Sequence, residues 1–343
     1  MTVLHICPLD KFLPPFIEFV RKHIGTEDQL FFTYRSMKKY PYAPGPDAMH
    51  RDGKFSRYFS MFYQMYKSER VILHGLFDKF VIAGLFFQPW LLKKCFWLVW
   101  GADLYRQDLD GTSPWAPKVF FRRFVIRNMG HIVTSIDGDY ENAKAWYKPK
   151  GRRLAVYTYP SSLYTPAVGT PKNDGVIRIL LGNSADPSNN HIEAFEHLKK
   201  YAQENIEIYS PLSYGVPQYR DEVCRVGKEL FGDKFKPIVD FIQYDKYIEL
   251  LSTIDIAVFN HDRQQAMSNT RMLLGMGKKV YMKSGTSSFQ LFEKLDVKVF
   301  TLDEFSLDPQ FPESARNEQT IQRVYSPEAL KSNLIELFSC PVS

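Results

Sequence analysis

Short runs of consecutive apolar, β-branched and aromatic residues recur along the chain and alternate with stretches of helical spacing. Continuous apolar runs are typical of parallel strands buried on both faces of a sheet. One set of runs precedes residue 160, another follows residue 175, and a segment containing Pro and Gly separates them. The pattern therefore predicts an α/β protein with two parallel sheets joined by a linker. The expected strands are 3–7, 30–34, 71–74, 96–100, 132–135, 154–157, 176–181, 206–209, 237–241, 254–259, 279–282 and 297–300.

The sequence indicates the N-termini of two helices. Ser188 or Asn189 is suited to cap a helix that carries apolar residues to position 202, and Ser326 with Pro327 is suited to open the last helix. We expect a first domain over 1–160, a linker over 161–175 and a second domain over 176–325. We expect the terminal helix, within 326–343, to pack back on the first domain.

The apolar stretches are too short to cross a bilayer. The longest notable one, 81–92, is interrupted by Gln88 and Pro89, and a spanning helix needs roughly 20 residues. The first residues carry no basic segment and run into Pro8 and Asp10, so they predict a strand rather than a signal peptide. The chain is expected to stay in the cytoplasm.

Charge is divided unevenly. Residues 1–160 hold 24 Lys and Arg against 14 Asp and Glu, a net +10, whereas residues 161–343 hold 20 against 24, a net −4. A basic half is attracted to anionic lipid or to nucleic-acid phosphate. Segments 58–67 and 118–127 mix aromatics with cations, which suits a lipid headgroup layer; alternatively, they are core helices whose cationic side chains reach outward. The cations expected to face a membrane or an acceptor are Arg57, Lys67, Arg122, Arg123 and Arg127.

The sequence lacks the motifs that bind several common cofactors. No G-x-G-x-x-G follows the first strand and no P-loop occurs, which disfavours simple NAD or ATP chemistry. The four cysteines form no C-x-x-C pair, so free thiols are expected. Acidic pairs stand at 108 and 110 and at 137 and 139. Asp137 and Asp139 follow a strand, as a metal-binding pair would, but they also precede a helical pattern, and we favour helix capping.

Candidate chemistry lies where strands end, because open α/β sheets bind ligands at the carboxyl ends of their strands. His74 ends one apolar strand beside Gly75. Asp103 follows a Trp-rich strand, where partial desolvation would raise the pKa of its carboxyl, so it is the best candidate general base. The alternative role for Asp103 is to orient the following turn.

Two loops of the second half suit a phosphate. One is rich in amides and hydroxyls and opens a helix, and the other carries an arginine before a helix. Together they indicate a nucleotide-diphosphate ligand. Tyr244 is a candidate to stack on the nucleobase, or else a core aromatic. The candidate donor-binding residues are Gly182, Asn183, Ser184, Asn189, Tyr244, Arg263, Gln264, Gln265, Ser268, Asn269 and Thr270.

At these residues the chain resembles the TDP-N-acetylfucosamine:lipid II N-acetylfucosaminyltransferases of enterobacterial common antigen synthesis, glycosyltransferase family 56. The resemblance spans nearly the whole chain and rests on four motifs in order, although Ala266 and Ser268 stand where the family usually has glycine. It implies a GT-B architecture, two Rossmann-like domains with parallel sheets facing across a cleft. The C-terminal domain would hold the donor and the N-terminal domain the acceptor. The motifs are His74-Gly75, residues 100–105, Gly182-Asn183-Ser184 with 186–192, and Arg263-Gln264-Gln265.

The resemblance also implies an activity. A 6-deoxy amino sugar, N-acetylfucosamine-like, would pass from a nucleotide-diphosphate donor, TDP favoured, to a hydroxyl of an undecaprenyl-diphosphate-linked saccharide in bacterial cell-surface polysaccharide synthesis. Asp103 or His74 would accept the proton. The enzyme would need no metal and no cofactor, and it would lie peripherally on the cytoplasmic face of the inner membrane.

Two other functions remain as alternatives. The basic half suits a non-catalytic protein that binds nucleic acid or an anionic surface, but no RNP, KH or helix-turn-helix signature supports it, and no nucleic-acid partner is expected. A nucleotide-sugar isomerase would need a bound dinucleotide, and the glycine fingerprint for one is missing.

Overall fold

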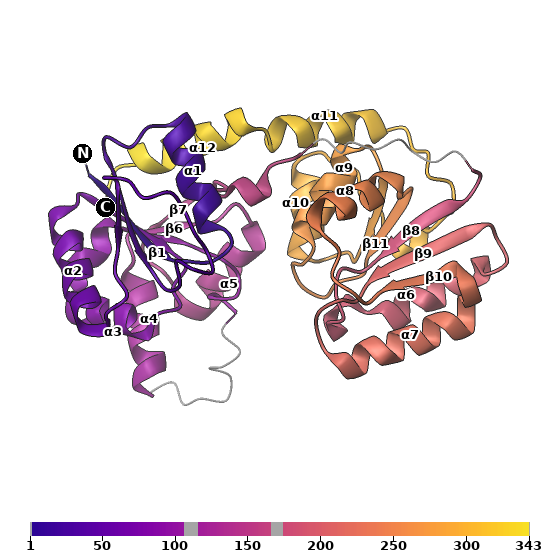
Figure 1. The fold of residues 1–343 in the computed structure, drawn as a ribbon, viewed down its shortest axis with the longest axis horizontal. Coiled ribbons are helices and arrows are strands. Elements are labelled where there is room, and N and C mark those ends of the chain that lie inside the picture. The colour runs from indigo at the N-terminus through magenta and orange to yellow at the C-terminus, as the bar shows by residue number, and fades with distance from the viewer. Residues whose placement is uncertain (1, 106–115, 166–173, 343) are drawn as a thin grey trace. The chain divides into compact units, whose positions relative to one another are not determined.

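The computed structural model describes residues 2–105, 116–165 and 174–342 (Figure 1). The chain divides into two compact units. The N-terminal unit comprises Met1–Leu163 and Pro327–Ser343, and the C-terminal unit comprises Tyr164–Ser326. Half of the predicted linker, residues 166–173, and the acidic pair at 108 and 110 lie outside the described residues.

The N-terminal unit is built on a parallel seven-stranded sheet in the order β3-β2-β1-β4-β5-β6-β7. Its strands are β1 (Val3–Pro8), β2 (Gln29–Tyr34), β3 (Ala48–His50), β4 (Arg70–His74), β5 (Cys95–Leu98), β6 (His131–Val133) and β7 (Arg152–Leu154). Its helices are α1 (Leu13–His23), α2 (Lys54–Lys67), α3 (Lys79–Phe87), η1 (Pro89–Lys94), α4 (Pro117–Asn128), α5 (Asp137–Tyr147), η3 (Pro160–Ser162) and α12 (Pro327–Ser339).

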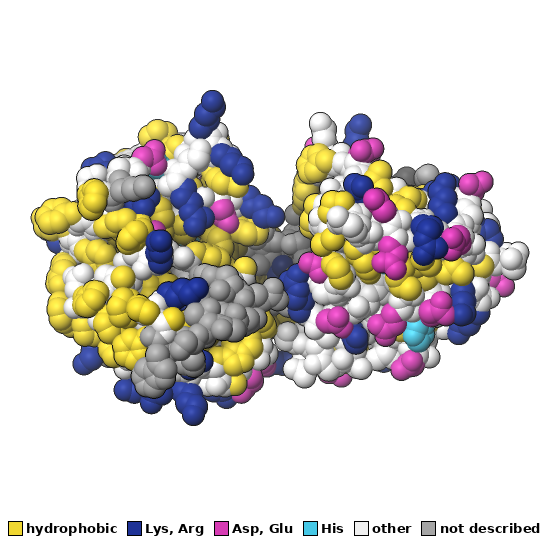
Figure 2. All heavy atoms as spheres, turned by 90° about the horizontal axis from the view of Figure 1, so that it is seen from below, with side chains coloured by type: hydrophobic (Ala, Val, Ile, Leu, Met, Phe, Trp, Pro, Cys, Tyr) yellow, Lys and Arg dark blue, Asp and Glu magenta, His cyan; other side chains and the backbone are white. Residues whose placement is uncertain are grey.

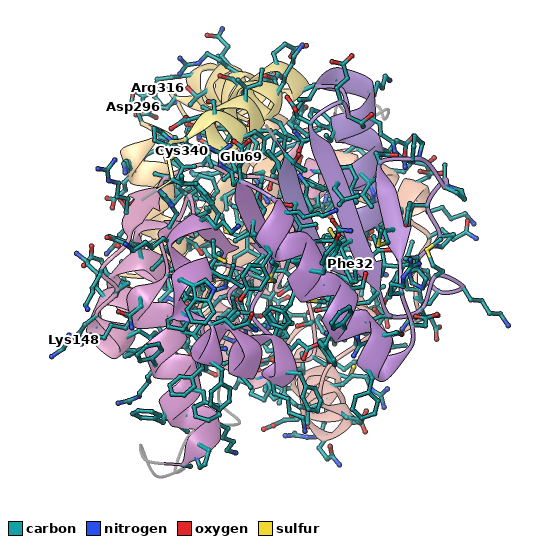
Figure 3. All side chains as sticks on the ribbon, turned by 90° about the vertical axis from the view of Figure 1, so that its left-hand side faces the viewer. Phe32, Glu69, Lys148, Asp296, Arg316 and Cys340 are labelled. Carbon is teal, nitrogen blue, oxygen red and sulfur yellow. The ribbon has the colours of Figure 1, made fainter. Side chains whose placement is uncertain are left out.

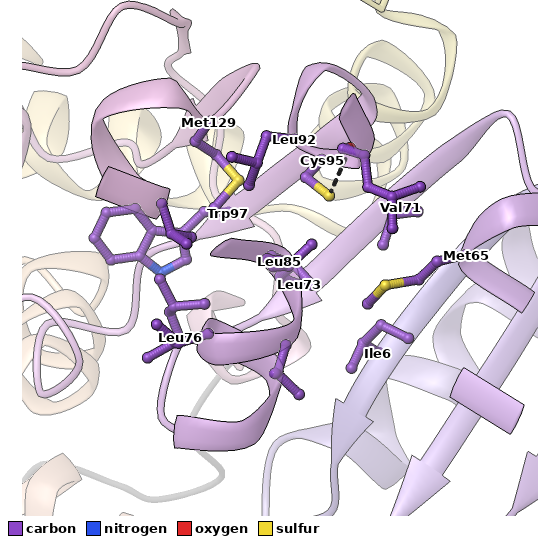
Figure 4. Packing of buried hydrophobic residues seen from close by; sticks show 14 of the residues in the cluster. Ile6, Met65, Val71, Leu73, Leu76, Leu85, Leu92, Cys95, Trp97 and Met129 are labelled. Carbon is purple, nitrogen blue, oxygen red and sulfur yellow. Dashed lines mark hydrogen bonds between the residues drawn. The ribbon is translucent and has the colours of Figure 1, made fainter. Parts of the chain in front are cut away.

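Alternate residues of the buried strands supply two cores, one on each face of this sheet. Val71 and Leu73 of β4 belong to the core under α2 to α5, which Figure 4 shows from close by, and Ile72 belongs to the core under α1 and α12. Helices on both faces explain why the strands appear as continuous apolar runs in the sequence.

Helix α12 belongs to the N-terminal unit although it ends the chain. Its buried side chains, Leu330, Leu334, Leu337 and Phe338, lie in one core with residues of β1 and α1. The buried Arg70 guanidinium donates to the carbonyl oxygens of Phe338 and Cys340, and Figure 3 shows Cys340 beside Glu69 at the start of β4. Arg70 thus satisfies carbonyls that a helix end leaves without intrahelical partners.

The C-terminal unit holds a parallel five-stranded sheet in the order β10-β9-β8-β11-β12. Its strands are β8 (Ile177–Leu181), β9 (Ile206–Pro211), β10 (Phe235–Ile238), β11 (Ile256–Phe259) and β12 (Lys279–Met282). Its helices are η4 (Pro187–Asn189), α6 (His191–Leu198), η5 (Lys199–Tyr201), α7 (Pro217–Phe231), η6 (Gly232–Lys234), α8 (Tyr244–Thr253), α9 (Met267–Gly275), α10 (Ser287–Lys294), η7 (Leu302–Glu304) and α11 (Ser314–Val324).

The predicted strands are confirmed with local differences. The expected strand at 297–300 is wrong, because only Phe300 makes a bridge, to Tyr281. The short strand β3 was not predicted. The helix expected to be capped by Ser188 or Asn189 has Asn190 as its N-cap and begins at His191, because 187–189 form a 3-10 turn and Asn190 is left-handed, with a φ of 51°. No helix in the described part of the chain is long and apolar enough to span a membrane.

Candidate active site

The two phosphate-compatible loops meet at the switch point of the C-terminal sheet. Strand β8 lies between β9 and β11, so the chain leaves β8 and β11 in opposite directions along the sheet. In open α/β sheets the crevice at this point, outside the carboxyl ends of the strands, is where ligands bind. The loop after β8 begins with Gly182, and the loop after β11 begins with Asn260.

The loop after β8 is held in shape by buried amides. Gly182 has a φ of +69°, and a Cβ there would stand 2.3 Å from His191 Nε2, so the position requires glycine. The fully buried Asn189 accepts a bond from the Asn183 amide at 2.9 Å and donates to Ser184 Oγ at 3.4 Å. Asn189 and the buried Ser184 therefore position the loop, and Asn183, half-buried, lies closer to its surface.

Hydrogen bonds join the two loops. The Asp262 amide donates to Ser188 O at 3.1 Å, and the side-chain amides of Asn189 and Gln265 are in contact at 3.0 Å. Arg263, 55% exposed, donates to Asp186 Oδ2 at 3.0 Å. The pair holds an exposed guanidinium at the loop junction, and a guanidinium of this kind is suited to bind a phosphate group.

Helix α9 starts directly after this arginine loop, with the left-handed Ala266 (φ 54°) as its N-cap. Of the three polar residues predicted to bind the donor here, Ser268 is exposed. Asn269 Nδ2 donates to Tyr247 OH at 2.8 Å. Thr270 is fully buried and donates to Ala266 O at 3.0 Å, so its predicted contact with the donor does not fit this geometry.

Four buried polar atoms in these loops have no hydrogen-bond partner among the described residues: Asn183 Oδ1, His191 Nε2, Asn260 Nδ2 and His261 Nε2. Burial lowers the pKa of His191 to about 3 and that of His261 to about 4, so both rings are neutral at pH 7. Unpaired buried polar groups are uncommon and require an explanation, and a bound ligand would provide one.

Exposed aromatics stand at the neighbouring strand ends. Tyr244, 60% exposed at the start of α8, is not a core residue. Tyr214 after β9 is 62% exposed and accepts from Asn183 Nδ2 at 3.0 Å, and Phe241 after β10 is 86% exposed. Tyr214 and Phe241 were not among the predicted site residues. The sequence feature that could have indicated them is an aromatic residue shortly after each of two strands.

In the N-terminal unit, Asp103 is fully buried and both of its carboxyl oxygens are occupied. The Trp100 amide donates to Oδ1 at 2.8 Å, and the Leu76 amide and Trp97 Nε1 donate to Oδ2 at 2.8 and 2.6 Å. Burial raises the pKa of this carboxyl, and the donors with the nearby Arg122 charge oppose the shift. The prediction of a general base does not fit, because a base must reach its proton; Asp103 joins the loops after β4 and β5.

His74 is also buried and fully engaged. Trp100 Nε1 donates to Tyr159 OH at 2.8 Å, so the phenol's own proton points to His74 Nδ1, 2.5 Å away. His74 Nε2 then donates to His5 Nδ1 at 3.1 Å, and His5 Nε2 donates to Gln29 Oε1 at 2.8 Å. Because its lone pair already accepts a bond and burial lowers its pKa, His74 does not fit the predicted role of a base.

A family model described as 4-alpha-L-fucosyltransferase, glycosyl transferase group 56, matches residues 55–317. The chain belongs to this glycosyltransferase family. Solved structures share its GT-B fold at low identity. Anabaena Alr3699/HepE in complex with UDP and glucose has a TM-score of 0.67 at 10% identity, covering 99% of this chain and 100% of that one. WaaG, a glycosyltransferase involved in lipopolysaccharide biosynthesis, has a TM-score of 0.59 at 10% identity with the same coverage.

A third match, an E. coli trehalose-6-phosphate structure bound with UDP-2-fluoro glucose, has a TM-score of 0.64 at 9% identity and covers 99% of this chain and 100% of that one. The predicted fold class, the family and the enzyme class are therefore confirmed. Within the described ranges, this glycosyltransferase holds no group of three or more His, Cys, Asp or Glu that could bind a metal ion.

The acidic pair of the glycosyltransferase lies in the first turn of α5, where the helix dipole stabilises carboxylates, but the N-cap itself is Ile136. Asp137 is 40% exposed and pairs with Arg153 at 2.5 Å. Asp139 is 2% exposed, and its Oδ1 accepts from Tyr105 OH at 2.9 Å. The two carboxylates therefore have different environments despite their spacing.

An exposed aromatic face covers helices α2, α3 and α4 with η1, and Figure 2 shows hydrophobic side chains gathered on this unit with cations among them. Its residues are Phe55, Phe59, Tyr63, Tyr66, Phe80, Phe87, Trp90 and Phe120, of which Phe55 is 92% and Phe59 80% exposed.

The cations predicted for this surface behave differently. Lys67, Arg123 and Arg127 are exposed, and Lys67 Nζ lies 4.6 Å from the Tyr63 ring centroid. Arg57 is half-buried and stacks over aromatic rings. Arg122 was wrongly placed on the surface: it is 1% exposed and donates inward to the carbonyls of Leu76 and Asp103, the first at 2.8 Å.

Proposed function

We propose that this glycosyltransferase moves a 6-deoxy amino sugar from a nucleotide-diphosphate donor, with TDP favoured, to a hydroxyl of an undecaprenyl-diphosphate-linked saccharide. The C-terminal unit holds the donor and the N-terminal unit the acceptor. The observation that carries the donor assignment is the junction of the loops after β8 and β11. There Arg263, the start of α9 and four buried polar atoms that lack a partner among the described residues lie together at the switch point.

The chemistry follows from where charge develops. As the bond between the anomeric carbon and the diphosphate breaks, the leaving group gains negative charge. Arg263 and the positive end of the α9 dipole stabilise that charge, and a preorganised group of this kind contributes more to the transition state than to the ground state. The ion pair with Asp186 orients the guanidinium before the donor arrives.

The aromatic face supports a lipid-linked acceptor. Exposed Phe and Trp with neighbouring Lys and Arg suit the boundary between headgroups and acyl chains, and anionic lipid attracts each nearby cation by about 1 kcal/mol. Phe55 and Phe59 are too exposed to serve the core, where Met61 and Met65 of the same helix are fully buried. Burying the two rings in the interface would bring the acceptor unit to the bilayer.

Ligand-induced thermal shifts with TDP, UDP, GDP and CMP test the donor assignment. A ligand at a hundredfold excess over its dissociation constant stabilises the protein by about 2.7 kcal/mol. We expect TDP to give the largest shift, and Arg263→Ala to weaken binding by about 1.5–3 kcal/mol. The matched control is Arg225→Ala, an exposed arginine that pairs within α7. If no nucleotide diphosphate shifts the wild-type melting temperature, the proposed function is wrong.

Co-sedimentation with vesicles tests the membrane contact. We expect binding to phosphatidylglycerol vesicles and not to phosphatidylcholine vesicles, with a loss in the double variant Phe55→Ser, Phe59→Ser. Tyr214→Ser, an exposed aromatic of the other unit, is the control. Binding of the protein to RNA in moderate salt, without binding to vesicles, would instead support the nucleic-acid hypothesis.

A further inference from the structure

Asp139 is a buried carboxylate that, besides the dipole of α5, has little to balance its charge among the described residues. It follows β6, the strand next to β5, at the carboxyl edge of the N-terminal sheet. In the described part of the chain its hydrogen-bond donor is the neutral Tyr105 hydroxyl. Asp103, buried to a similar degree, accepts from three donors and lies near the Arg122 guanidinium. A buried charge usually needs partners of that kind, so Asp139 requires a different explanation.

The hydrogen bonds around Asp139 have a fixed direction. Asn142 Nδ2 donates to Tyr105 OH at 2.8 Å, and an amide nitrogen only donates. The Tyr105 hydroxyl must therefore direct its proton to Asp139 Oδ1, 2.9 Å away. This contact engages one carboxyl oxygen and orients the group, and among the described residues Oδ2 has no hydrogen-bond donor.

The earlier hypotheses for this motif do not explain the residue. Asp137, not Asp139, carries the ion pair of this turn, and the described residues offer no metal cluster. Asp139 lies beyond the carboxyl end of β6, one strand from Asp103, at the edge of the sheet where this class of fold places groups that act on a ligand. An uncompensated buried carboxyl at such a position is a candidate for proton transfer.

We propose that Asp139 is the general base of the glycosyl transfer, with Tyr105 and Asn142 as positioning residues. The inference rests on the proposed function and commits it to a direct displacement with inversion. The acceptor hydroxyl gives its proton to Asp139 Oδ2 while its oxygen bonds to the anomeric carbon. The bond from that carbon to the donor diphosphate breaks, and the diphosphate leaves with the electron pair.

The environment suits this role. The pKa of Asp139 is raised to about 6, chiefly by burial; the Tyr105 hydrogen bond opposes this shift and the Asp103 charge adds to it. Among the described residues of the neighbouring elements, Arg122 donates to the Asp103 carbonyl and Arg153 is paired with Asp137. At pH 7.5 the carboxylate is ionised, yet it is more basic than an exposed aspartate, as a general base should be.

The test is the pH profile of kcat/KM for transfer from the TDP-linked 6-deoxy amino sugar to a short-chain prenyl-diphosphate saccharide. We expect Asp139→Asn to lower kcat/KM by about 10²- to 10⁴-fold at pH 7.5, and Asp137→Asn to change it less than threefold. Tyr105→Phe should keep the high-pH rate and move the acidic limb of the profile to higher pH, because the lost hydrogen bond had lowered the pKa of Asp139.

Calorimetric titration with TDP separates the possible failures. If Asp139→Asn binds TDP normally and keeps wild-type turnover, the base assignment is overturned while the proposed function stands. If Tyr105→Phe lowers the rate equally at every pH, Tyr105 does not act through the Asp139 carboxylate, which also contradicts the proposal. Wild-type protein that neither binds TDP nor transfers sugar overturns the proposed function itself.

Discussion

Asp139→Asn is expected to stabilise the N-terminal unit at neutral pH while it removes activity. The pKa of Asp139 rises from 3.8 to about 6 on folding because the group is buried. A shift of about 2 pKa units corresponds to about 3 kcal/mol, and the dipole of α5 offsets about 0.3–1 kcal/mol of this. Asparagine has nearly the same shape and no charge to desolvate, so the variant does not carry this cost.

The sign of the effect depends on pH. The folded state binds the Asp139 proton more tightly than the unfolded state does, so the contribution of the carboxyl to stability is greatest below about pH 4. That contribution is lost as pH rises from about 4 through 6, and it changes little above that. The advantage of Asp139→Asn over wild type should therefore be small at pH 4 and approach about 2–3 kcal/mol at pH 7 and above.

Urea unfolding followed by tryptophan fluorescence measures this difference. All five tryptophans of the chain precede residue 150, so their emission reports the N-terminal unit without a contribution from the other unit. Asp137→Asn is the control, because that carboxylate is 40% exposed and paired with Arg153. If wild type and Asp139→Asn show the same dependence of stability on pH from 4 to 7, the carboxyl is not the uncompensated group that the geometry indicates.

Three further variants test the scaffold and the donor loops. Leu334→Ala should destabilise the N-terminal unit by about 2.7–5 kcal/mol, read as an earlier tryptophan unfolding transition, because the side chain is fully buried between α12 and the sheet. Gly182→Ala should lower the melting temperature measured by circular dichroism and weaken TDP binding, because the backbone there has a positive φ and the added methyl group would clash with the His191 ring. The control is Gly285→Ala, where φ is a similar +76° but the space is open. It should cost only the backbone strain, about 1–2 kcal/mol. Tyr244→Ala should weaken TDP binding by about 1–3 kcal/mol in calorimetry if the ring stacks on the base, and unchanged affinity would place the base elsewhere.

The strands and the donor loops were predictable because both signals are local. A run of apolar residues shows a strand buried on both faces, and the residues that follow it necessarily lie at the sheet edge where ligands bind. The junction of the loops at 182–191 and 260–270 follows from the order of β8 and β11 in the sheet. By contrast, the prediction of a strand at 297–300 was wrong, because a buried segment can be apolar without hydrogen-bonding to a neighbouring strand.

Side-chain direction was not predictable from the same patterns. Arg122 and Arg123 are neighbours in a basic stretch, and only the packing of α4 against the loop after β5 turns one inward and leaves the other in solvent. Asp103 was expected to act on a substrate because it follows a strand, but three donors from separate segments occupy its oxygens. For Asp139, the motif was visible in the sequence, but only the three-dimensional structure shows that the described residues supply it with a single hydrogen-bond donor.

The return of the C-terminus to the first sheet has a consequence for how the protein is made. Residues 327–343 complete a core whose other members are synthesised within the first 163 positions. While the ribosome is still translating, α1 and the strands beneath it lack the four apolar side chains that α12 supplies. The continuous segment 164–326, although it emerges later, contains its entire sheet and can fold first. Nascent chains arrested before residue 327 should therefore expose that incomplete surface to chaperones, whereas synthesis and docking of α12 close it.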